Sequence, residues 1–350
     1  MKGKMRRVTG MIFLFVLTGI SLTMYGQTVT SLVLSGHTFA KGREVIGKVA
    51  ATGGATLSEV RLTGPSAGHF YLSPDHELRI RPSLIRPGVR WYDVTVEAKA
   101  DGRVLKQQFR VVHDQFSRNR VIAHRGAWKK AETTENSIAA LQNAIRLGCQ
   151  GSEFDIHMSA DSVLFINHDP HIGDLVIEKT PAARLSEIRL SNGEPLPTLE
   201  QYLKAGLNQN RTRLILEIKP TSLGPERARF VAASVMNMVK SLHAEAWVDY
   251  ISFDFEICRE LVRLDPFVRV AYLKGDKSPA ELADAGLWGL DYHYNVFREN
   301  EAMINAARDR RLTLNAWTVN DRETMNWLLQ NNFDFITTNE PELLLELTGK

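Results

Sequence analysis

The chain has 350 residues, more than one average domain contains, so two domains are expected. Hydrophobic residues make up 44% and charged residues 24%, a balance that excludes a largely disordered chain and supplies apolar material for sizeable cores. The formal net charge is only +3 and the sequence has no dense basic block, so nucleic acid is not an expected partner.

Residues 1–26 have the layout of a secretory signal peptide. A basic start that includes Lys2 and Arg7 is followed by an apolar run over residues 11–22 and then by small or polar residues. The alternative is an uncleaved membrane anchor, but the apolar run is shorter than the roughly 20 residues that a spanning helix needs. We therefore expect an exported protein, periplasmic or secreted, with no stable membrane span after cleavage.

Residues 27–113 predict a small all-β domain. About seven short alternating runs, separated by clusters of Gly, Pro and Ser, favour a β-sandwich. Residues 69–98 within it resemble a cadherin-type or immunoglobulin-like module, without an acidic calcium-linker motif. We expect a spacer or packing role for this domain, and we interpret the polar residues 114–119 as a linker.

From residue 120 to residue 350 the pattern changes to α/β. Eight apolar strand-like runs alternate with helical periodicity over about 230 residues, which predicts a TIM-like (β/α)8 barrel. The expected strands are residues 120–124, 151–157, 213–218, 248–252, 268–273, 287–292, 312–317 and 334–337. A ninth run, residues 163–167, follows residue 157 too closely for a parallel crossover, so we expect an antiparallel hairpin at the barrel mouth.

The chain has two cysteines, Cys149 and Cys258, both in apolar settings within the barrel region. Export permits a disulfide, but two buried free thiols are the preferred interpretation. Neither cysteine has the spacing of a metal ligand.

Three carboxylates are expected at the mouth of the barrel. Side chains at i and i+2 of a strand share one face, so Glu153 and Asp155 point the same way, as do Glu217 and Lys219 on the neighbouring strand. Each carboxylate alone could pair with a basic side chain at a strand end. Three together are unfavourable unless a cation neutralises them, and an all-oxygen cluster suits Ca²⁺ or Mg²⁺ rather than zinc.

Four further side chains at the same strand ends suit phosphoryl chemistry. His124 and His168 can act as a general acid and a general base near neutral pH. Arg125 offers a planar fork of donors that matches phosphate oxygens, and Lys219 adds a second positive charge. With a divalent cation, this set favours phosphoryl transfer.

From residue 120 onward the chain resembles the glycerophosphodiester phosphodiesterase family. The motifs that carry the resemblance keep their order and spacing over about two-thirds of the chain. They are VIAHRG at 121–126, TENS at 134–137, GSEFDIHMSADSVLFINHDP at 151–170, LILEIKP at 214–220, ISFD at 251–254, LNAWTVND at 314–321 and FITTNEP at 335–341.

The resemblance implies a role for each matching position. His124 and His168 match the catalytic acid/base pair and Arg125 the phosphate-binding arginine. The implied metal ligands are Glu153, Asp155 and Glu217, and the implied substrate-binding residues are Lys219, Trp317 and Glu135. Trp317 could equally be a core aromatic residue. The chemistry of its side chain alone does not assign a role to Glu135. Which histidine is the acid stays open.

The implied reaction is cleavage of a small-molecule glycerophosphodiester to glycerol 3-phosphate and an alcohol. In glycerol substrates of this family the neighbouring hydroxyl is thought to attack first, giving a cyclic phosphate that water opens. Two departures are Thr134 in place of the usual proline and Ser137 in place of threonine. Residues 171–199 also fit the family pattern poorly, which concerns the substrate more than the chemistry.

Two other functions would also suit a chain with this barrel. One is a phospholipase or sphingomyelinase-D-like enzyme that acts on intact lipids with the same barrel chemistry; a long apolar surface loop would favour it, and the sequence has none. The other is a secreted binding protein with an inactive barrel, which the presence of every expected catalytic residue disfavours. The sequence does not indicate the oligomeric state.

Overall fold

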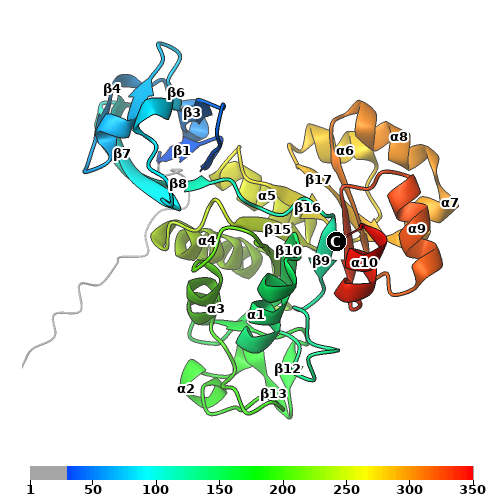
Figure 1. Ribbon diagram of the computed structural model, residues 1–350. Coiled ribbons are helices and arrows are strands. Elements are labelled where there is room, and N and C mark those ends of the chain that lie inside the picture. Colours follow the sequence, from blue (N-terminus) through cyan, green and yellow to red (C-terminus); the bar gives the residue numbers. More distant parts are fainter. Residues whose placement is uncertain (1–29, 350) are drawn as a thin grey trace, which may run out of the picture.

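The computed structural model describes residues 30–349 (Figure 1). The predicted signal peptide, residues 1–26, lies outside these residues, so it stays a prediction. Within residues 30–349, none of the helices combines the length and the apolar character needed to cross a bilayer.

The N-terminal region, drawn in blue and cyan in Figure 1, consists of two four-stranded sheets. In sheet order, the first contains β1 (Leu32–Leu34), β3 (Val45–Ala51), β6 (Glu77–Ile80) and β5 (Phe70–Leu72), and the second contains β2 (Thr38–Phe39), β8 (Arg103–His113), β7 (Trp91–Ala100) and β4 (Ser58–Thr63). Along β7 the residues Tyr92, Val94 and Val96 are buried because alternate side chains of a strand point to one face. Side chains from both sheets share one hydrophobic core.

Eight parallel strands close into a barrel, as predicted. The strands are β9 (Val121–Ala123), β10 (Gly151–Met158), β14 (Arg213–Ile218), β15 (Val248–Ser252), β16 (Val270–Tyr272), β17 (Gly289–His293), β18 (Thr313–Trp317) and β19 (Phe335–Thr338). The ring closes where β19 pairs with β9, and β9 pairs with β10. The short β11 (Leu164–Ile166) returns antiparallel to β10, so the predicted hairpin is also confirmed.

The outer helices follow the predicted periodicity with one difference. They are α1 (Ile138–Leu147), α3 (Leu199–Gly206), α4 (Pro225–Ser241), α5 (Phe255–Leu264), α6 (Pro279–Asp284), α7 (Tyr294–Glu299), α8 (Ala302–Asp309), α9 (Arg322–Gln330) and α10 (Pro341–Leu347). The helix expected over residues 299–310 corresponds to α8, and α7, just before it, is an additional helix. Asn300 has φ −144° and ψ 76°, a non-helical backbone that ends the first helix before the second begins.

Residues 171–199, which fitted the family pattern poorly, form a small subdomain beside the mouth. It contains β12 (His171–Ile172), β13 (Leu175–Val176), the 3₁₀ turn η4 (Ile177–Lys179) and α2 (Ala182–Leu185). Phe165, Ile177, Leu185 and Leu196 form a separate hydrophobic cluster under it. The subdomain therefore has its own small core, outside the main alternation of strands and helices.

The β domain packs against the end of the barrel where the strands begin. Trp247, which precedes β15, is fully buried, and its ring meets those of Trp91 and Phe116 edge-on at 6.4 Å. The guanidinium of Arg213, at the start of β14, lies 4.4 Å from the Phe116 ring centroid. The β domain therefore lies at the opposite end of the barrel from the C-terminal ends of the strands.

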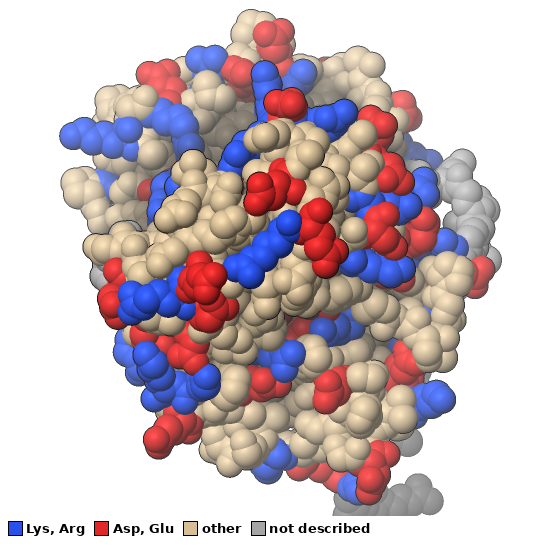
Figure 2. All heavy atoms as spheres, turned by 90° about the vertical axis from the view of Figure 1, so that its right-hand side faces the viewer, with Lys and Arg blue, Asp and Glu red and all other residues tan. Residues whose placement is uncertain are grey.

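Surface charge is mixed on the face that carries the C-terminal helices. There Lys and Arg side chains alternate with Asp and Glu side chains (Figure 2). Arg322 on α9, for example, pairs with Glu346 on α10 at 2.9 Å.

Cys149 and Cys258 are buried free thiols, as expected.

Candidate active site

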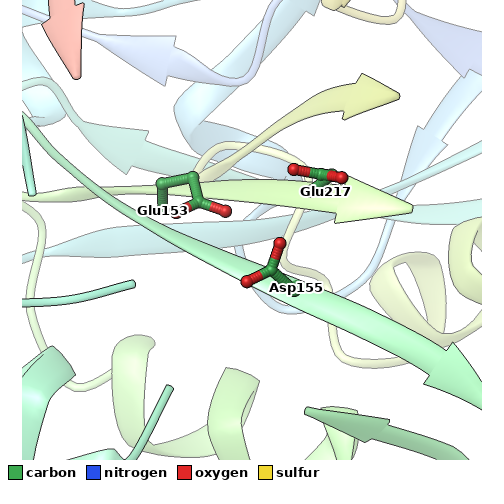
Figure 3. Close-up of side chains that lie close together, drawn as sticks. All are labelled: Glu153, Asp155 and Glu217. Carbon is green, nitrogen blue, oxygen red and sulfur yellow. The ribbon is translucent and has the colours of Figure 1, made fainter. Parts of the chain in front are cut away.

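The three predicted carboxylates converge where β10 and β14 run side by side (Figure 3). Asp155 stands opposite Glu217 in the register of the two strands, and Glu153 precedes Asp155 on the same face. Ligand oxygens of all three lie within 4.8 Å of one another, and each side chain is buried. The convergence follows from the i, i+2 spacing and from the pairing of neighbouring strands.

Burial and mutual repulsion make this cluster costly when all three groups are ionised. Burial, together with the neighbouring carboxylates, raises the pKa of Glu153 well above its usual value, and it raises the pKa of Glu217 to about 8. Burial also acts against ionisation of Asp155, but Lys219 and hydrogen bonds to the carboxylate hold its pKa below the usual value.

The Lys219 ammonium lies between two of these carboxylates. Its Nζ is 2.8 Å from Asp155 Oδ1 and 2.7 Å from Glu217 Oε1. Burial alone would lower the pKa of this ammonium, yet the two carboxylates raise it. Glu153 Oε1 is buried and has no hydrogen-bond partner within residues 30–349. Lys219 and the more distant Arg125 thus leave the three carboxylates incompletely neutralised, and the carboxylate oxygens fit a divalent cation.

Arg125 is held by an unusual backbone turn just after β9. Its φ is 56°, in the left-handed region, and its backbone N–H donates to Glu153 Oε2 at 2.8 Å. A Cβ at Gly126, where φ is 81°, would lie 2.6 Å from the Ala140 side chain, so only glycine fits there. The Arg125 guanidinium donates to Glu135 at 2.7 Å, and its Nε is 3.8 Å from Asp155 Oδ2.

His124 is largely enclosed at the end of β9. Its Nδ1 is 2.8 Å from Asn339 Oδ1, and its Nε2 is 4.0 Å from Glu153 Oε2. Burial, followed by the nearby Arg125 charge, lowers the pKa of His124 to about 4 in the metal-free protein. The imidazole is therefore neutral near pH 7 in this state.

His168 follows the hairpin strand β11 and is more open to solvent. Its side chain is 36% exposed, against 18% for His124. Its Nδ1 lies 2.8 Å from Asp169 Oδ1, and His157 Nε2 lies 3.1 Å from its backbone oxygen. The two predicted acid/base histidines thus have different partners, an amide for one and a carboxylate for the other.

One cavity brings the predicted residues together. Its polar lining includes His124, Arg125, Glu153, His168, Glu217 and Lys219, and its apolar lining includes Ile251, Phe253, Leu273 and Trp317. The Trp317 ring meets Phe253 edge-on at 5.4 Å, and its Nε1 donates to the backbone oxygen of Asp291 at 2.8 Å. Trp317 therefore lines the cavity and also packs against a core neighbour. Glu135 reaches the cavity through Arg125.

Sequence reasoning left three polar residues of this site without a role. Asn136 is buried with φ 58°; its Nδ2 donates to Asp155 Oδ2 at 2.8 Å, and its Oδ1 accepts from the Asp155 backbone N–H at 3.2 Å. The Asn339 side chain contacts Nδ1 of His124. Asp291, whose pKa is raised by burial to about 7, also lines the cavity. Asn136 and Asn339 stand within the quoted TENS and FITTNEP motifs, so position within a motif was the available signal.

Comparison with known proteins extends over the barrel. Residues 124–343 match the Glycerophosphoryl diester phosphodiesterase family. A glycerophosphodiester phosphodiesterase from Caldanaerobacter subterraneus subsp. tengcongensis is 26% identical over 246 residues, which cover 66% of this chain and 98% of the relative.

Solved structures agree with this match. The crystal structure of a glycerophosphodiester phosphodiesterase from Parabacteroides distasonis is similar with a TM-score of 0.65 and 41% identity, covering 67% of this chain and 98% of that one. An Oleispira antarctica phosphodiesterase in complex with the product sn-glycerol-3-phosphate shares the fold, with a TM-score of 0.58, 23% identity and coverage of 66% and 97%. The chain belongs to the glycerophosphoryl diester phosphodiesterase family and is a phosphodiester hydrolase of the (β/α)8 barrel type.

Proposed function

We propose that this enzyme cleaves glycerophosphodiesters to glycerol 3-phosphate and an alcohol, with a divalent cation and two histidines as acid and base. The observation that carries the proposal is the single cavity lined by two imidazoles, Arg125, Lys219 and carboxylates of the acidic cluster. This is the set that a phosphodiester needs: positive groups for its charge and imidazoles for proton transfer.

Glu153, Asp155 and Glu217 would hold the cation, and oxygen ligands of this kind suit Ca²⁺ or Mg²⁺. When bound, the ion supplies positive charge to phosphate oxygens. The unsatisfied oxygen of Glu153 and the raised pKa of Glu217 both support a site that gains from such a charge. Lys219, which contacts two of the carboxylates, would then be available to a substrate oxygen.

Arg125, the two histidines and Trp317 have different roles in the proposed reaction. Arg125 offers donors to a phosphate oxygen while Glu135 orients its guanidinium. One histidine of the pair His124 and His168 takes a proton from the glycerol hydroxyl that attacks phosphorus, and the other gives a proton to the oxygen of the leaving alcohol. Water then opens the resulting cyclic phosphate to give glycerol 3-phosphate. Trp317, beside Phe253, provides an apolar wall for carbon atoms of the substrate.

We further propose that the protein acts outside the cytoplasm and has three parts after the signal peptide. The basic and apolar layout of residues 1–26 supports export. The proposed parts are the β domain at 27–113, the linker at 114–119 and the barrel at 120–350. β8 ends at His113 and β9 begins at Val121, which supports this division. The matches above lie in the barrel, so the cadherin- or immunoglobulin-like identity of the β domain stays a prediction.

The experiment measures glycerol 3-phosphate release from glycerophosphocholine and glycerophosphoethanolamine with Ca²⁺, with Mg²⁺ and with EDTA. Wild type is compared with His124→Ala, His168→Ala and the control His76→Asn. His76 lies in the β domain with φ 63°, a backbone that asparagine also adopts, so the control keeps the fold. We expect metal-dependent release that both alanine variants lose and the control retains.

Absence of release from wild type with either metal would refute this substrate assignment. The same variants would then be tested on lysophospholipids and sphingomyelin, the substrates of the lipid-hydrolysing alternative. Release that persists in EDTA would refute the metal requirement, and release that persists in both alanine variants would refute the role of the histidines.

A further inference from the structure

We infer that Asn339 is the positioning residue that sets the tautomer of His124 and so leaves the Nε2 of His124 free to accept a proton. The inference rests on the proposed function, because it concerns the histidine to which that function gives a proton-transfer role. Asn339 lies in the FITTNEP motif, but the sequence by itself gives this residue no role.

The contact itself is short and is made inside the cavity wall. Asn339 Oδ1 lies 2.8 Å from His124 Nδ1. An amide oxygen is only an acceptor, so Nδ1 must be the protonated nitrogen of a neutral imidazole. The other nitrogen, Nε2, then carries the lone pair, and it lies on the side of Glu153 Oε2, at 4.0 Å.

The backbone at Asn339 and at His124 is placed by contacts that do not involve the Asn339 side chain. The backbone N–H of Asn339 donates to Asn320 Oδ1 at 2.9 Å, and the Thr338 hydroxyl lies 3.3 Å from the same oxygen. The backbone N–H of His124 donates to Thr338 O at 2.9 Å. Both ends of the pair are thus anchored through backbone atoms, and a changed side chain at position 339 leaves these anchors in place.

The group that contacts Nδ1 of His124 differs in charge from the group that contacts Nδ1 of His168. His168 has the carboxylate of Asp169 at Nδ1, whereas His124 has a neutral amide. A carboxylate stabilises an imidazolium, while an amide oxygen orients a neutral imidazole without adding charge. Asn339 therefore fixes the ring of His124 without adding charge and leaves its Nε2 as the nitrogen that can accept a proton.

The test uses the full chain loaded with Ca²⁺ or Mg²⁺ and three variants. Asn339→Leu has nearly the same shape but no acceptor, and Asn339→Asp keeps an acceptor oxygen. The matched control is Asn331→Ala, whose side-chain amide donates to Trp327 O away from the cavity. Selective ¹⁵N-histidine labelling reports which ring nitrogen of His124 is protonated, with the signal assigned by its loss in His124→Ala.

We expect wild type, Asn339→Asp and Asn331→Ala to show His124 protonated at Nδ1, and Asn339→Leu to lose that preference. With glycerophosphocholine, kcat of Asn339→Leu should fall by about 10–100-fold with little change in KM. Asn339→Asp keeps the acceptor but adds a charge, so its kcat should fall less than that of Asn339→Leu. An Nε2-protonated His124 in wild type, or an unchanged tautomer and kcat in Asn339→Leu, would overturn the inference. The tautomer measurement needs no substrate, so failure of the proposed function leaves this test intact.

Discussion

Removal of one carboxylate from the acidic cluster should make the metal-free protein more stable. In the folded chain, burial and Asp155 raise the pKa of Glu217 to about 8. A raised carboxyl pKa means that the folded state holds its proton more tightly than the unfolded state does. The contribution of this tighter proton binding to the free energy of unfolding is therefore fully present below the unfolded pKa of about 4.5. It is lost as pH rises through the folded pKa of about 8.

The size of the effect follows from this difference between the folded and unfolded pKa of Glu217. At neutral pH the difference corresponds to an upper limit of about 3 kcal/mol. Lys219 contacts Glu217 at 2.7 Å, and Glu217→Gln loses that ion pair. We therefore expect Glu217→Gln to raise the free energy of unfolding by about 1–3 kcal/mol in EDTA at neutral pH. Well below pH 4.5, where the carboxyl is protonated in both states, we expect no gain.

Urea unfolding followed by tryptophan fluorescence would measure this, in EDTA and in millimolar Ca²⁺ or Mg²⁺. Wild type should gain stability from the metal, while Glu217→Gln should gain little because one ligand is missing. The control is Glu200→Gln, at an exposed glutamate that pairs with Lys204 on the surface of α3. If Glu217→Gln were less stable than wild type in EDTA at both pH values, and still gained stability from metal, the argument from charge repulsion would be wrong.

Three further outcomes are expected. Burial raises the pKa of Glu245 to about 7, so Glu245→Gln should stabilise the chain above about pH 8 and leave it unchanged near pH 4.5, as urea unfolding at the two pH values would show. Trp247→Ala should lower the free energy of unfolding by about 3–5 kcal/mol, because the ring is fully buried against Trp91 and Phe116; a loss no larger than that of Phe230→Ala, at a phenylalanine that is 46% exposed, would contradict this. Burial raises the pKa of the Cys149 thiol to about 12, so an aromatic disulfide reagent should label it only after unfolding in urea, and rapid labelling of the native chain would count against this.

Much of the barrel and its acidic cluster could be predicted from local patterns. Alternating apolar runs and helical periodicity identified the eight strands, and the short spacing after residue 157 identified the antiparallel hairpin. The positions of Glu153 and Asp155 two residues apart placed both on one face, next to Glu217 on the following strand. These conclusions succeed because period and spacing report which face of an element a side chain occupies.

Contacts between distant elements were decided by the tertiary structure. The Lys219 ammonium contacts both Asp155 and Glu217, which sequence spacing placed only near each other. The non-helical backbone at Asn300 separates α8 from the additional helix α7. Asn339 and His124 are 215 residues apart, and they meet because β19 closes the barrel against β9. A residue's period along the chain determines its face, but its partner across the barrel depends on closure and register, which no local pattern contains.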